Sequence, residues 1–320
     1  MKFSVIGCGR WGSFLAWYLG INGHEVILYG REDSPNLRQL RETGENGMLR
    51  LPDRVKLTSC LREALQNEIV LVSVPSQQLR ALMQEAGPLY TGQRLFVLCM
   101  KGLEITTGLR LTQVVEQTVP PGSRTAVWLG PGHVQEFIKG VPNCMVIDST
   151  CQSDKELLIE AFSSNLIRFY YGEDLIGSEL GAAAKNIIGV AAGMLDGLAL
   201  GSLKGALMSR GTREVARLIL AAGGHEFSAY GLSHLGDYEA TLFSPYSNNR
   251  CFGEAFVQGR PYKHLAEGVY TVKALQPLAQ KLQTEMPICN TLYAILYEKA
   301  DPKQALDSLF ARSLKPEFSI

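Results

Sequence analysis

The sequence predicts an α/β doubly wound domain followed by an all-α domain. The first about thirty residues read as strand, glycine-rich loop, helix and strand, the unit that begins an open parallel sheet. From Leu175 onward, helical periodicity dominates and strand signals nearly vanish. Because 320 residues are too many for one small domain, we place two domains, at 1–172 and 173–320.

The first unit contains a glycine pattern in the setting that gives it meaning. A strand at 3–6 is followed by Gly7-Cys8-Gly9-Arg10-Trp11-Gly12, a helix at 13–20 and a strand at 25–29. Each of the three glycines has a role in a Rossmann-type domain. Gly7 would permit the tight turn, Gly9 would let the backbone approach a pyrophosphate, and Gly12 would allow the helix to pack closely on the strand. The helix N-terminus then faces the phosphates, so the pattern predicts that these glycines bind a dinucleotide.

The end of the second strand favours NADP over NAD. NAD sites commonly carry an acid there, whereas this chain has Gly30-Arg31, which leaves room for a 2′-phosphate and supplies a cation for it. Glu32 and Asp33 leave NAD open, because either carboxylate could reach the ribose instead. Arg31 could also be an ordinary solvated arginine.

Further apolar runs predict buried parallel strands whose ends gather at one edge of the sheet. They lie at 68–73, 95–99, 125–129, near 143–148 and at 166–170. Lys101 and the turn Gly130-Pro131-Gly132 follow two of these strands and would lie near a cofactor. The alternatives are a surface lysine and a plain chain reversal.

The second half is predicted to be helical, and the space between the two domains is the expected active site. Candidate helices are 177–199, 204–223, 228–234, 251–258, 262–268, 271–282, 287–299 and 303–312. The first contains Lys185-Asn186 within an apolar run of small residues. A buried ammonium needs a partner or a lowered pKa, which suits proton transfer. Lys185 could instead extend its head to water.

Composition excludes several classes of protein. The 31 basic and 31 acidic residues balance, so no nucleic-acid surface is expected. Seven scattered cysteines without a CxxC pair, and five histidines without ligand spacing, indicate neither a disulfide framework nor a metal site. The N-terminal residues read as a strand rather than a signal peptide, and charges at Lys185 and Asp196 argue against a membrane span. We expect a cytoplasmic protein.

Taken together, the motifs resemble the bacterial-type NAD(P)-dependent glycerol-3-phosphate dehydrogenases over nearly the whole chain. The motifs are Gly7-Cys8-Gly9-Arg10-Trp11-Gly12, Lys101-Gly102-Leu103-Glu104, Gly130-Pro131, Lys185-Asn186, Ser209-Arg210-Gly211, Gly236-Asp237 with Thr241, and Asn249-Arg250 before Phe252-Gly253. The resemblance implies an enzyme with a small-molecule substrate that catalyses reversible hydride transfer between dihydroxyacetone phosphate and glycerol 3-phosphate. It also implies a place in glycerophospholipid metabolism and leaves open whether the enzyme is a homodimer.

The resemblance also implies roles for individual residues. Lys185 would transfer the proton, Lys101 would contact cofactor and substrate, and Asp237 would be an acid at the substrate site. Because a buried ammonium needs a counter-charge, we expect Asp237 to hold Lys185 in place. The implied cofactor contacts are Gly7, Gly9, Arg10, Trp11, Gly12, Arg31, Lys101, Val134 and Glu267. The implied substrate contacts are Lys101, Gly130, Gly132, Lys185, Asp237, Ser247, Asn248, Asn249 and Arg250.

Departures from the family pattern gather around the expected substrate. Asn248 stands where the family's Ser-Arg-Asn-Arg has its first arginine, the main cation for the substrate phosphate. Three further departures are Ser202 for an asparagine, Gly132 for a serine or threonine, and Ser233-His234 for small residues. Losing the arginine should weaken phosphate binding by roughly 2–3 kcal/mol unless another cation has moved in.

Arg250, Lys204, or N–H groups of a helix capped by Ser247 could supply that replacement. Three hypotheses therefore remain. The leading one is a glycerol-3-phosphate dehydrogenase with an altered phosphate site. The second is a related NADP-dependent reductase of another small carbonyl or hydroxy compound. The third is a non-catalytic, cofactor-binding protein, against which the retention of Lys101, Lys185 and Asp237 speaks.

Overall fold

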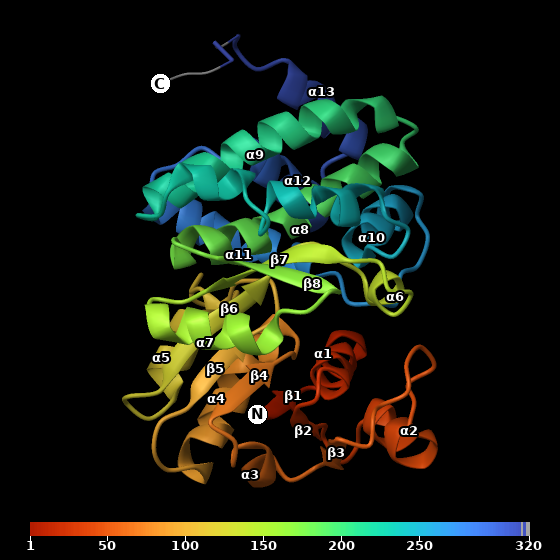
Figure 1. Cartoon of the computed structure of the whole chain (residues 1–320). Coiled ribbons are helices and arrows are strands. Elements are labelled where there is room, and N and C mark those ends of the chain that lie inside the picture. The colour runs from red at the N-terminus through yellow and green to blue at the C-terminus, as the bar shows by residue number, and fades with distance from the viewer. Residues whose placement is uncertain (315, 318–320) are drawn as a thin grey trace.

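The computed structural model describes residues 1–314, 316 and 317 and shows a twisted sheet covered by helices, with a helical half beside it (Figure 1). Eight strands form one sheet in the order β3-β2-β1-β4-β5-β6-β7-β8. Their bounds are β1 Lys2–Ile6, β2 Glu25–Tyr29, β3 Val55–Thr58, β4 Ile69–Val72, β5 Leu95–Leu98, β6 Arg124–Leu129, β7 Asn143–Asp148 and β8 Ile167–Tyr171. The predicted doubly wound α/β class is confirmed.

Two details of the sheet differ from the prediction. Strand β3 was not predicted, because only Thr58 of its four residues is buried and Lys56 interrupts the apolar run. Strand β7 pairs antiparallel with β6, through Val127 opposite Asp148, whereas β7 and β8 are parallel to each other. Apolar runs show that a strand is buried but carry no information about its direction.

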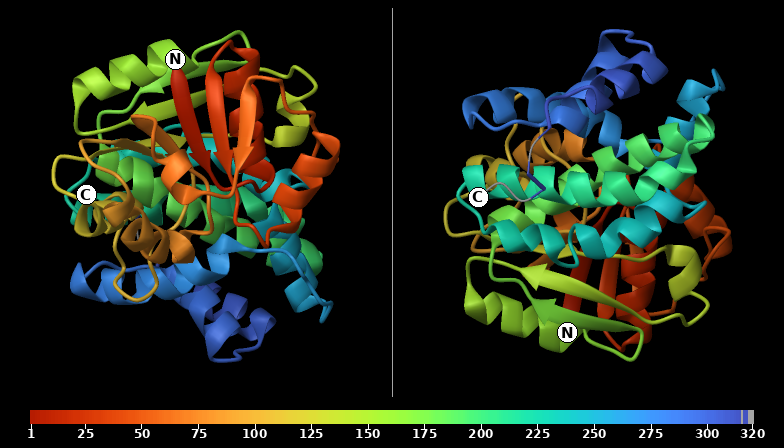
Figure 2. Two further views of the ribbon diagram at one scale, coloured as in Figure 1. Left: turned by 90° about the horizontal axis from the view of Figure 1, so that it is seen from below. Right: turned by 90° about the horizontal axis from the view of Figure 1, so that it is seen from above.

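Helices cover both faces of this sheet (Figure 2). Their bounds are α1 Arg10–Ile21, α2 Pro35–Thr43, α3 Leu61–Ala64, α4 Leu79–Ala86, α5 Leu111–Thr118, α6 Val134–Phe137 and α7 Gln152–Phe162, with short 3₁₀ turns at Ser76–Gln78 and Gly87–Leu89. The strands place buried apolar side chains on both faces, as the 0 % exposure of Phe3, Val5 and Ile6 illustrates. A sheet buried on both sides needs these two helical layers.

The helical half follows β8 and contains one long central helix, α8. Its elements are α8 Leu175–Gly197, η3 Gly201–Leu203, α9 Lys204–Ala221, η4 Glu226–Tyr230, η5 Leu235–Asp237, a π-helical turn at Glu239–Phe243, α10 Asn248–Val257, α11 Glu267–Lys281, α12 Pro287–Tyr297 and α13 Pro302–Phe310. The helix predicted at 262–268 is wrong, since residues 260–266 are irregular and α11 begins at Glu267. At 228–234 only a 3₁₀ turn forms.

Close packing between α8 and α10 positions the site. A Cβ on Gly193 would lie 1.9 Å from the Arg250 carbonyl oxygen, and one on Gly253 would lie 2.1 Å from that of Val190. Only glycine allows two helices to approach this closely. The contact holds the N-terminus of α10 beside the middle of α8, where Lys185 lies.

The division into domains at residue 172 stays a prediction, although β8 ends at Tyr171 and α8 begins at Leu175. All seven cysteines are free. Within the described part of the chain, no helix is long and apolar enough to cross a membrane.

Candidate active site

The glycine loop after β1 has the geometry that a dinucleotide requires. Gly7 has a φ of +110°, and a Cβ on Gly12 would lie 1.7 Å from the Gly7 carbonyl oxygen. Gly9 caps α1 without a side-chain hydrogen bond, and a Cβ there would meet no atom within 4 Å. The open space over Gly9 and the free N–H groups of the first turn of α1 fit a pyrophosphate.

The acids after β2 are engaged by other side chains. Arg31 is exposed and forms an ion pair with Asp33 at 3.2 Å, while Glu32 accepts hydrogen bonds from Arg41 at 2.9 and 3.0 Å. Hydrogen bonds from Ser59 and Arg41 hold the pKa of Glu32 below its usual range. Both carboxylates are thus paired with arginines, and the contact of Arg31 with a ribose 2′-phosphate stays a prediction.

The other residues predicted to contact the cofactor differ in how far their side chains are exposed and in which groups they bond. Trp11 is half-buried, with its ring 5.0 Å from that of Phe14, and Val134 is 3 % exposed within the same apolar core. Glu267 accepts the Ser76 backbone N–H at 3.1 Å and a hydrogen bond from the Ser76 hydroxyl. This pair joins the start of α11 to the loop after β4, and burial raises the pKa of Glu267. Because Val134 is buried, it offers a ligand little surface, and Glu267 is already hydrogen-bonded to Ser76.

Lys185 lies buried in the middle of α8 and is fully engaged. Its Nζ lies 2.7 Å from Asp237 Oδ2 and donates to Thr241 Oγ1 at 2.7 Å. Burial lowers the pKa of Lys185 to about 8, the Asp237 charge opposes that shift, and the Lys101 charge adds to it. The alternative, in which the head extends to water, is therefore wrong, since the residue is 7 % exposed.

Lys101, from the loop after β5, meets the same carboxylate. Its Nζ donates to Asp237 Oδ2 at 2.6 Å and to the Gly130 carbonyl oxygen at 2.7 Å. Asp237 is 1 % exposed, and its Oδ2 thus accepts from two ammonium groups. We call Lys101, Lys185, Asp237 and Thr241 the lysine centre. It places two positive charges around one buried negative charge, so the centre carries a net charge that suits a negatively charged oxygen.

Asp237 and Thr241 are placed by an irregular segment. His234 is fully buried, and its ring bonds the Gly181 carbonyl at 2.8 Å and the Tyr238 hydroxyl at 2.7 Å. Burial lowers the pKa of His234 to about 4, so the ring is neutral at pH 7. Thr241 lies in the π-helical turn, a feature frequent at functional sites. The Ser233-His234 departure thus anchors this segment to α8.

A chain of amides links the lysine centre to the start of α10. Asn186 donates to the Lys101 carbonyl oxygen at 3.0 Å and accepts from the Asn249 side chain at 3.0 Å. Asn249 in turn accepts the Gly268 N–H at 2.9 Å. Asn186 and Thr241 were not among the predicted site residues, although both stood in the quoted motifs. The signal for Asn186 was a second polar residue inside a buried, apolar helix.

The loop after β6 explains another departure from the family pattern. Gly132 has a φ of +138°, and a Cβ there would lie 2.3 Å from the Phe137 ring. A serine or threonine at this position would therefore need Phe137 to move. The neighbouring His133 bonds the Ala240 carbonyl oxygen at 2.8 Å, and burial lowers its pKa. Ser202, a further departure, is exposed in the turn before α9.

Ser247 caps α10, as the phosphate hypothesis required. Its hydroxyl accepts the Arg250 N–H at 3.4 Å. The N–H groups of Asn248 and Asn249 have no intrahelical acceptor, because they lie in the first turn of the helix. The Asn248 side chain accepts a hydrogen bond from the Tyr262 hydroxyl at 3.1 Å. We call Ser247, Asn248, Asn249 and Tyr262 the Asn248 region.

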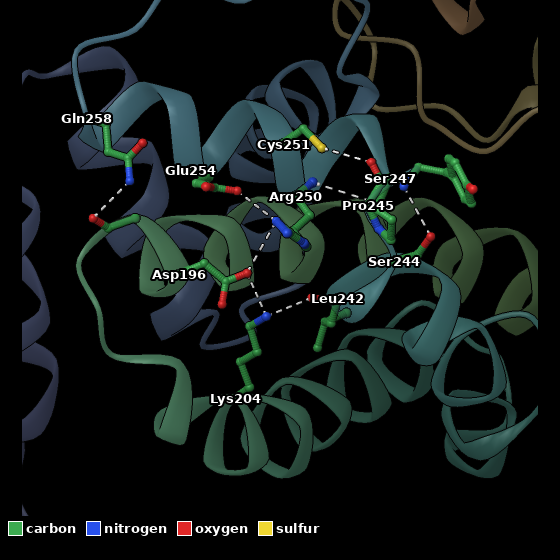
Figure 3. Close-up of polar contacts among 12 residues, drawn as sticks. Asp196, Lys204, Leu242, Ser244, Pro245, Ser247, Arg250, Cys251, Glu254 and Gln258 are labelled. Atoms are coloured by element: carbon green, nitrogen blue, oxygen red, sulfur yellow. Dashed lines mark hydrogen bonds and ion pairs between the residues drawn. The ribbon is translucent and has the colours of Figure 1, made fainter.

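The two residues expected to replace the missing arginine face elsewhere (Figure 3). Arg250 lies 2.8 Å from Glu254 and 3.4 Å from Asp196. Lys204 lies 2.6 Å from the same Asp196 carboxylate and donates to the Leu242 carbonyl oxygen at 3.0 Å. Both cations are neutralised within this cluster, so the expectation that either one binds the phosphate finds no support in their contacts.

A cavity of about 700 Å³ lies away from these residues, between α8, α9, α12 and α13. None of the predicted site residues lines it, and most of its wall is apolar. Among the described residues, no group of three or more His, Cys, Asp or Glu side chains could hold a metal ion.

Comparison with known proteins agrees with this geometry. The family described as NAD-dependent glycerol-3-phosphate dehydrogenase matches with its N-terminal part at residues 2–155 and its C-terminal part at 174–307. The chain is 34% identical over 337 residues to the glycerol-3-phosphate dehydrogenase [NAD(P)+] of Chlorobium phaeobacteroides, covering 99% of each chain. The corresponding Listeria monocytogenes protein is 34% identical over 331 residues, with 99% of this chain and 98% of that one covered.

Solved structures extend the comparison to three dimensions. The glycerol-3-phosphate dehydrogenase of Coxiella burnetii superposes with a TM-score of 0.90 at 30% identity, over 97% of this chain and 99% of that one. The yeast enzyme, at 18% identity and a TM-score of 0.80 over 97% and 99% of the two chains, shares the fold. The chain belongs to the NAD(P)-dependent glycerol-3-phosphate dehydrogenase family.

Proposed function

We propose that this protein interconverts dihydroxyacetone phosphate and sn-glycerol 3-phosphate, with Lys185 as the proton donor and acceptor. The relatives that match over the full length carry the name of this activity. The single observation that carries the proposal is the contact of Lys185 and Lys101 with one oxygen of Asp237. A non-catalytic binding protein has no use for a buried ammonium whose pKa is lowered to about 8.

The lysine centre suits the reduction of a ketone. Negative charge develops on the carbonyl oxygen as the carbon is reduced, and two ammonium groups beside that oxygen stabilise the charge. Lys185 donates its proton to the oxygen, while Lys101, fixed by the Gly130 carbonyl, orients the substrate. Thr241 and Asp237 hold the Lys185 Nζ at its position through both steps.

The lowered pKa of Lys185 serves both directions of the reaction. A pKa of about 8 leaves most of the groups protonated at pH 7, so that they act as acids toward a ketone. A substantial fraction becomes neutral above that pH and accepts the proton of an alcohol. An ordinary lysine, with a pKa of about 10.4, would serve oxidation poorly.

The cofactor we propose is NADP, with NAD as the alternative, and its nicotinamide supplies the hydride when bound. Gly7, Gly9 and Gly12 form the cradle for the pyrophosphate. Arg31 meets the 2′-phosphate, because Arg41 already binds the neighbouring Glu32. The relatives are named for both cofactors.

A second candidate function has one observation in its favour. Asn248 is neutral, and Arg250 and Lys204 are paired with acids, so the family's phosphate contact is missing. A related reductase of an unphosphorylated carbonyl compound would need no such contact. The relatives' names favour the phosphorylated substrate.

One assay separates the two functions. NADPH oxidation is measured with dihydroxyacetone phosphate, with unphosphorylated dihydroxyacetone and with a panel of 2-oxo acids. Our proposal expects kcat/KM for dihydroxyacetone phosphate to exceed that of every other compound by at least about a hundredfold, the range that a charged phosphate contact supplies. Higher activity with a 2-oxo acid would replace our assignment by the second candidate.

A further inference from the structure

The turn that follows β6 is held in place beside the lysine centre. Lys101 fixes its beginning, since the Lys101 Nζ donates to the Gly130 carbonyl oxygen at 2.7 Å. A Cβ on Gly130 would lie 2.9 Å from the Met145 Cα, so the turn packs closely against β7. His133, three residues further on, therefore extends from a backbone that is bonded at its start and packed along its length.

His133 contacts the segment that carries Thr241. Its Nε2 lies 2.8 Å from the Ala240 carbonyl oxygen, and its ring makes an edge contact with the Tyr246 ring at 5.7 Å. A carbonyl oxygen only accepts hydrogen bonds, so the Nε2 atom carries the proton. Burial lowers the pKa of His133, and the ring that donates this bond is therefore neutral at pH 7.

The carbonyl that His133 meets cannot be bonded within its own turn. Ala240 belongs to the π-helical turn Glu239–Phe243, in which the carbonyl of one residue accepts the N–H of the residue five positions later. For Ala240 that residue is Pro245, which has no N–H. His133 supplies the missing donor from the opposite wall of the site.

This bond closes a circuit of contacts around the lysine centre. Ala240 directly precedes Thr241, whose hydroxyl accepts from the Lys185 Nζ at 2.7 Å. A donor that fixes the Ala240 carbonyl also fixes the peptide unit that leads into Thr241. Through hydrogen bonds, ion pairs and short stretches of backbone, the circuit joins Lys101, Gly130, His133, Ala240, Thr241, Lys185 and Asp237.

We propose that His133 is a positioning residue, whose ring N–H donates to the Ala240 carbonyl oxygen and thereby holds Thr241 against the ammonium of Lys185. This rests on the proposed function, in which Lys185 transfers the proton. His133 acts on the reaction through Thr241 and not by contact with the reacting atoms. Because a displacement of about 1 Å in a reacting group can cost about a hundredfold in rate, the loss of this bond should be visible in kcat.

The kinetic test compares His133→Ala and His133→Gln with the matched control His24→Ala. The His24 ring is also half-buried and bonds a backbone carbonyl, that of Ala161 at 2.9 Å, but it lies before β2, away from the lysine centre. We expect His133→Ala to lower kcat for dihydroxyacetone phosphate about 5–30-fold, with KM for NADPH within about twofold. The amide of His133→Gln can donate to the same oxygen and should recover most of the rate, and His24→Ala should keep kcat within about twofold.

A double variant shows whether His133 acts through Thr241. Thr241→Val removes the hydroxyl and keeps the shape of the side chain. If the two residues act as one unit, His133→Ala/Thr241→Val should be at most about twofold slower than the slower single variant. Losses that multiply in the double variant, or a kcat of His133→Ala within about twofold of the parent, would overturn the proposal.

A crystal structure of His133→Ala makes the result independent of turnover. The distance between Thr241 Oγ1 and Lys185 Nζ should lengthen beyond about 3.5 Å, the limit of a hydrogen bond. An unchanged distance of 2.7 Å would overturn the proposal whatever the activity. A longer distance in the variant, together with a parent protein that turns over no dihydroxyacetone phosphate, would support the role of His133 and refute the proposed function instead.

Discussion

The lysine centre and the Asn248 region lie side by side, but they differ in how firmly the fold defines them. The lysine centre consists of buried and half-buried side chains from α8, the loop after β5 and the irregular segment before α10, and each of its four residues makes a polar contact of 2.7 Å or less. The Asn248 region comprises the first turn of a helix and the irregular residues 260–266. We assign the chemistry to the first, and recognition of the rest of the substrate to the second.

This difference explains why position 248 departs from the family pattern while Lys101, Lys185, Asp237 and Thr241 keep to it. Replacing a member of the lysine centre would leave a buried charge without a partner, which costs roughly 3–5 kcal/mol. Replacing residue 248 exchanges a half-buried side chain that bonds one tyrosine hydroxyl. Loops and helix ends tolerate such exchanges and another side chain can take over the contact.

The largest effect is expected at Lys185. Lys185→Ala removes the proton donor and one of the two cations beside the substrate oxygen, so kcat should fall about 10²–10⁴-fold with NADPH affinity nearly unchanged. Lys204→Met is the matched control, because Lys204 is also buried and paired with an aspartate at 2.6 Å. It should lose stability but keep kcat within about threefold. Equal losses in both variants would mean that Lys185 acts only through the fold.

Asp237→Asn should have the next largest effect. The amide cannot compensate two ammonium groups, so we expect kcat to fall about 10–100-fold. Because the charge of Asp237 raises the pKa of Lys185, its loss should lower that pKa further. The pH at which ketone reduction declines should therefore move down, measured as the alkaline limb of kcat/KM. A limb that stays in place would show that Asp237 does not set the state of Lys185.

A smaller effect is expected at the cofactor end. Arg31→Ala should weaken NADPH binding about five- to thirtyfold and NADH binding by less than twofold, since an exposed arginine–phosphate pair contributes roughly 1–2 kcal/mol. Arg38→Ala, an exposed arginine of the neighbouring helix α2, is the control. Fluorescence titration with both cofactors measures the ratio. Equal weakening of both would remove Arg31 from the reading of the 2′-phosphate.

The smallest effect is expected where the sequence alone predicted a large one. If other groups already bind the phosphate, such as the N–H groups in the first turn of α10, Asn248→Arg in the parent should change KM for dihydroxyacetone phosphate by less than about threefold. Without such a replacement, the added arginine should lower KM at least tenfold. Steady-state kinetics of this single variant distinguish a rebuilt phosphate site from a vacant one.

Sequence reasoning was most reliable where the physical demand was local. The glycine loop after β1 follows from steric rules, and the buried state of Lys185 follows from the apolar run around it. Strand β3 and the direction of β7 could not be predicted, because a strand of four residues with only one of them buried gives a weak signal and burial does not encode direction. The irregular stretch at 260–266 was mistaken for a helix, since its few apolar residues fit a helical period by chance.

In the site, too, local demands could be predicted and contacts that depend on tertiary packing could not. The pairing of Lys185 with Asp237 could be predicted because a buried charge needs a counter-charge and the family resemblance identified Asp237 as an acid at the substrate site. Its residue type could not show in which direction the Arg250 side chain points. Helix geometry alone places it about 200° around the axis from position 248. It faces Asp196 and Glu254 instead of the substrate. The bond between Asn186 and Asn249, 63 residues apart, depends on the packing of α8 against α10.

The pH dependence of the parent enzyme tests the central claim most directly. The claim is that Lys185, with a pKa of about 8, transfers the proton. Reduction of dihydroxyacetone phosphate needs the ammonium, so its kcat/KM should decline above about pH 8, while oxidation of glycerol 3-phosphate needs the neutral amine and should rise through the same pKa. Mirror-image limbs that cross near pH 8 would agree with the account. Rates that change in neither direction between about pH 7 and 10 would contradict it.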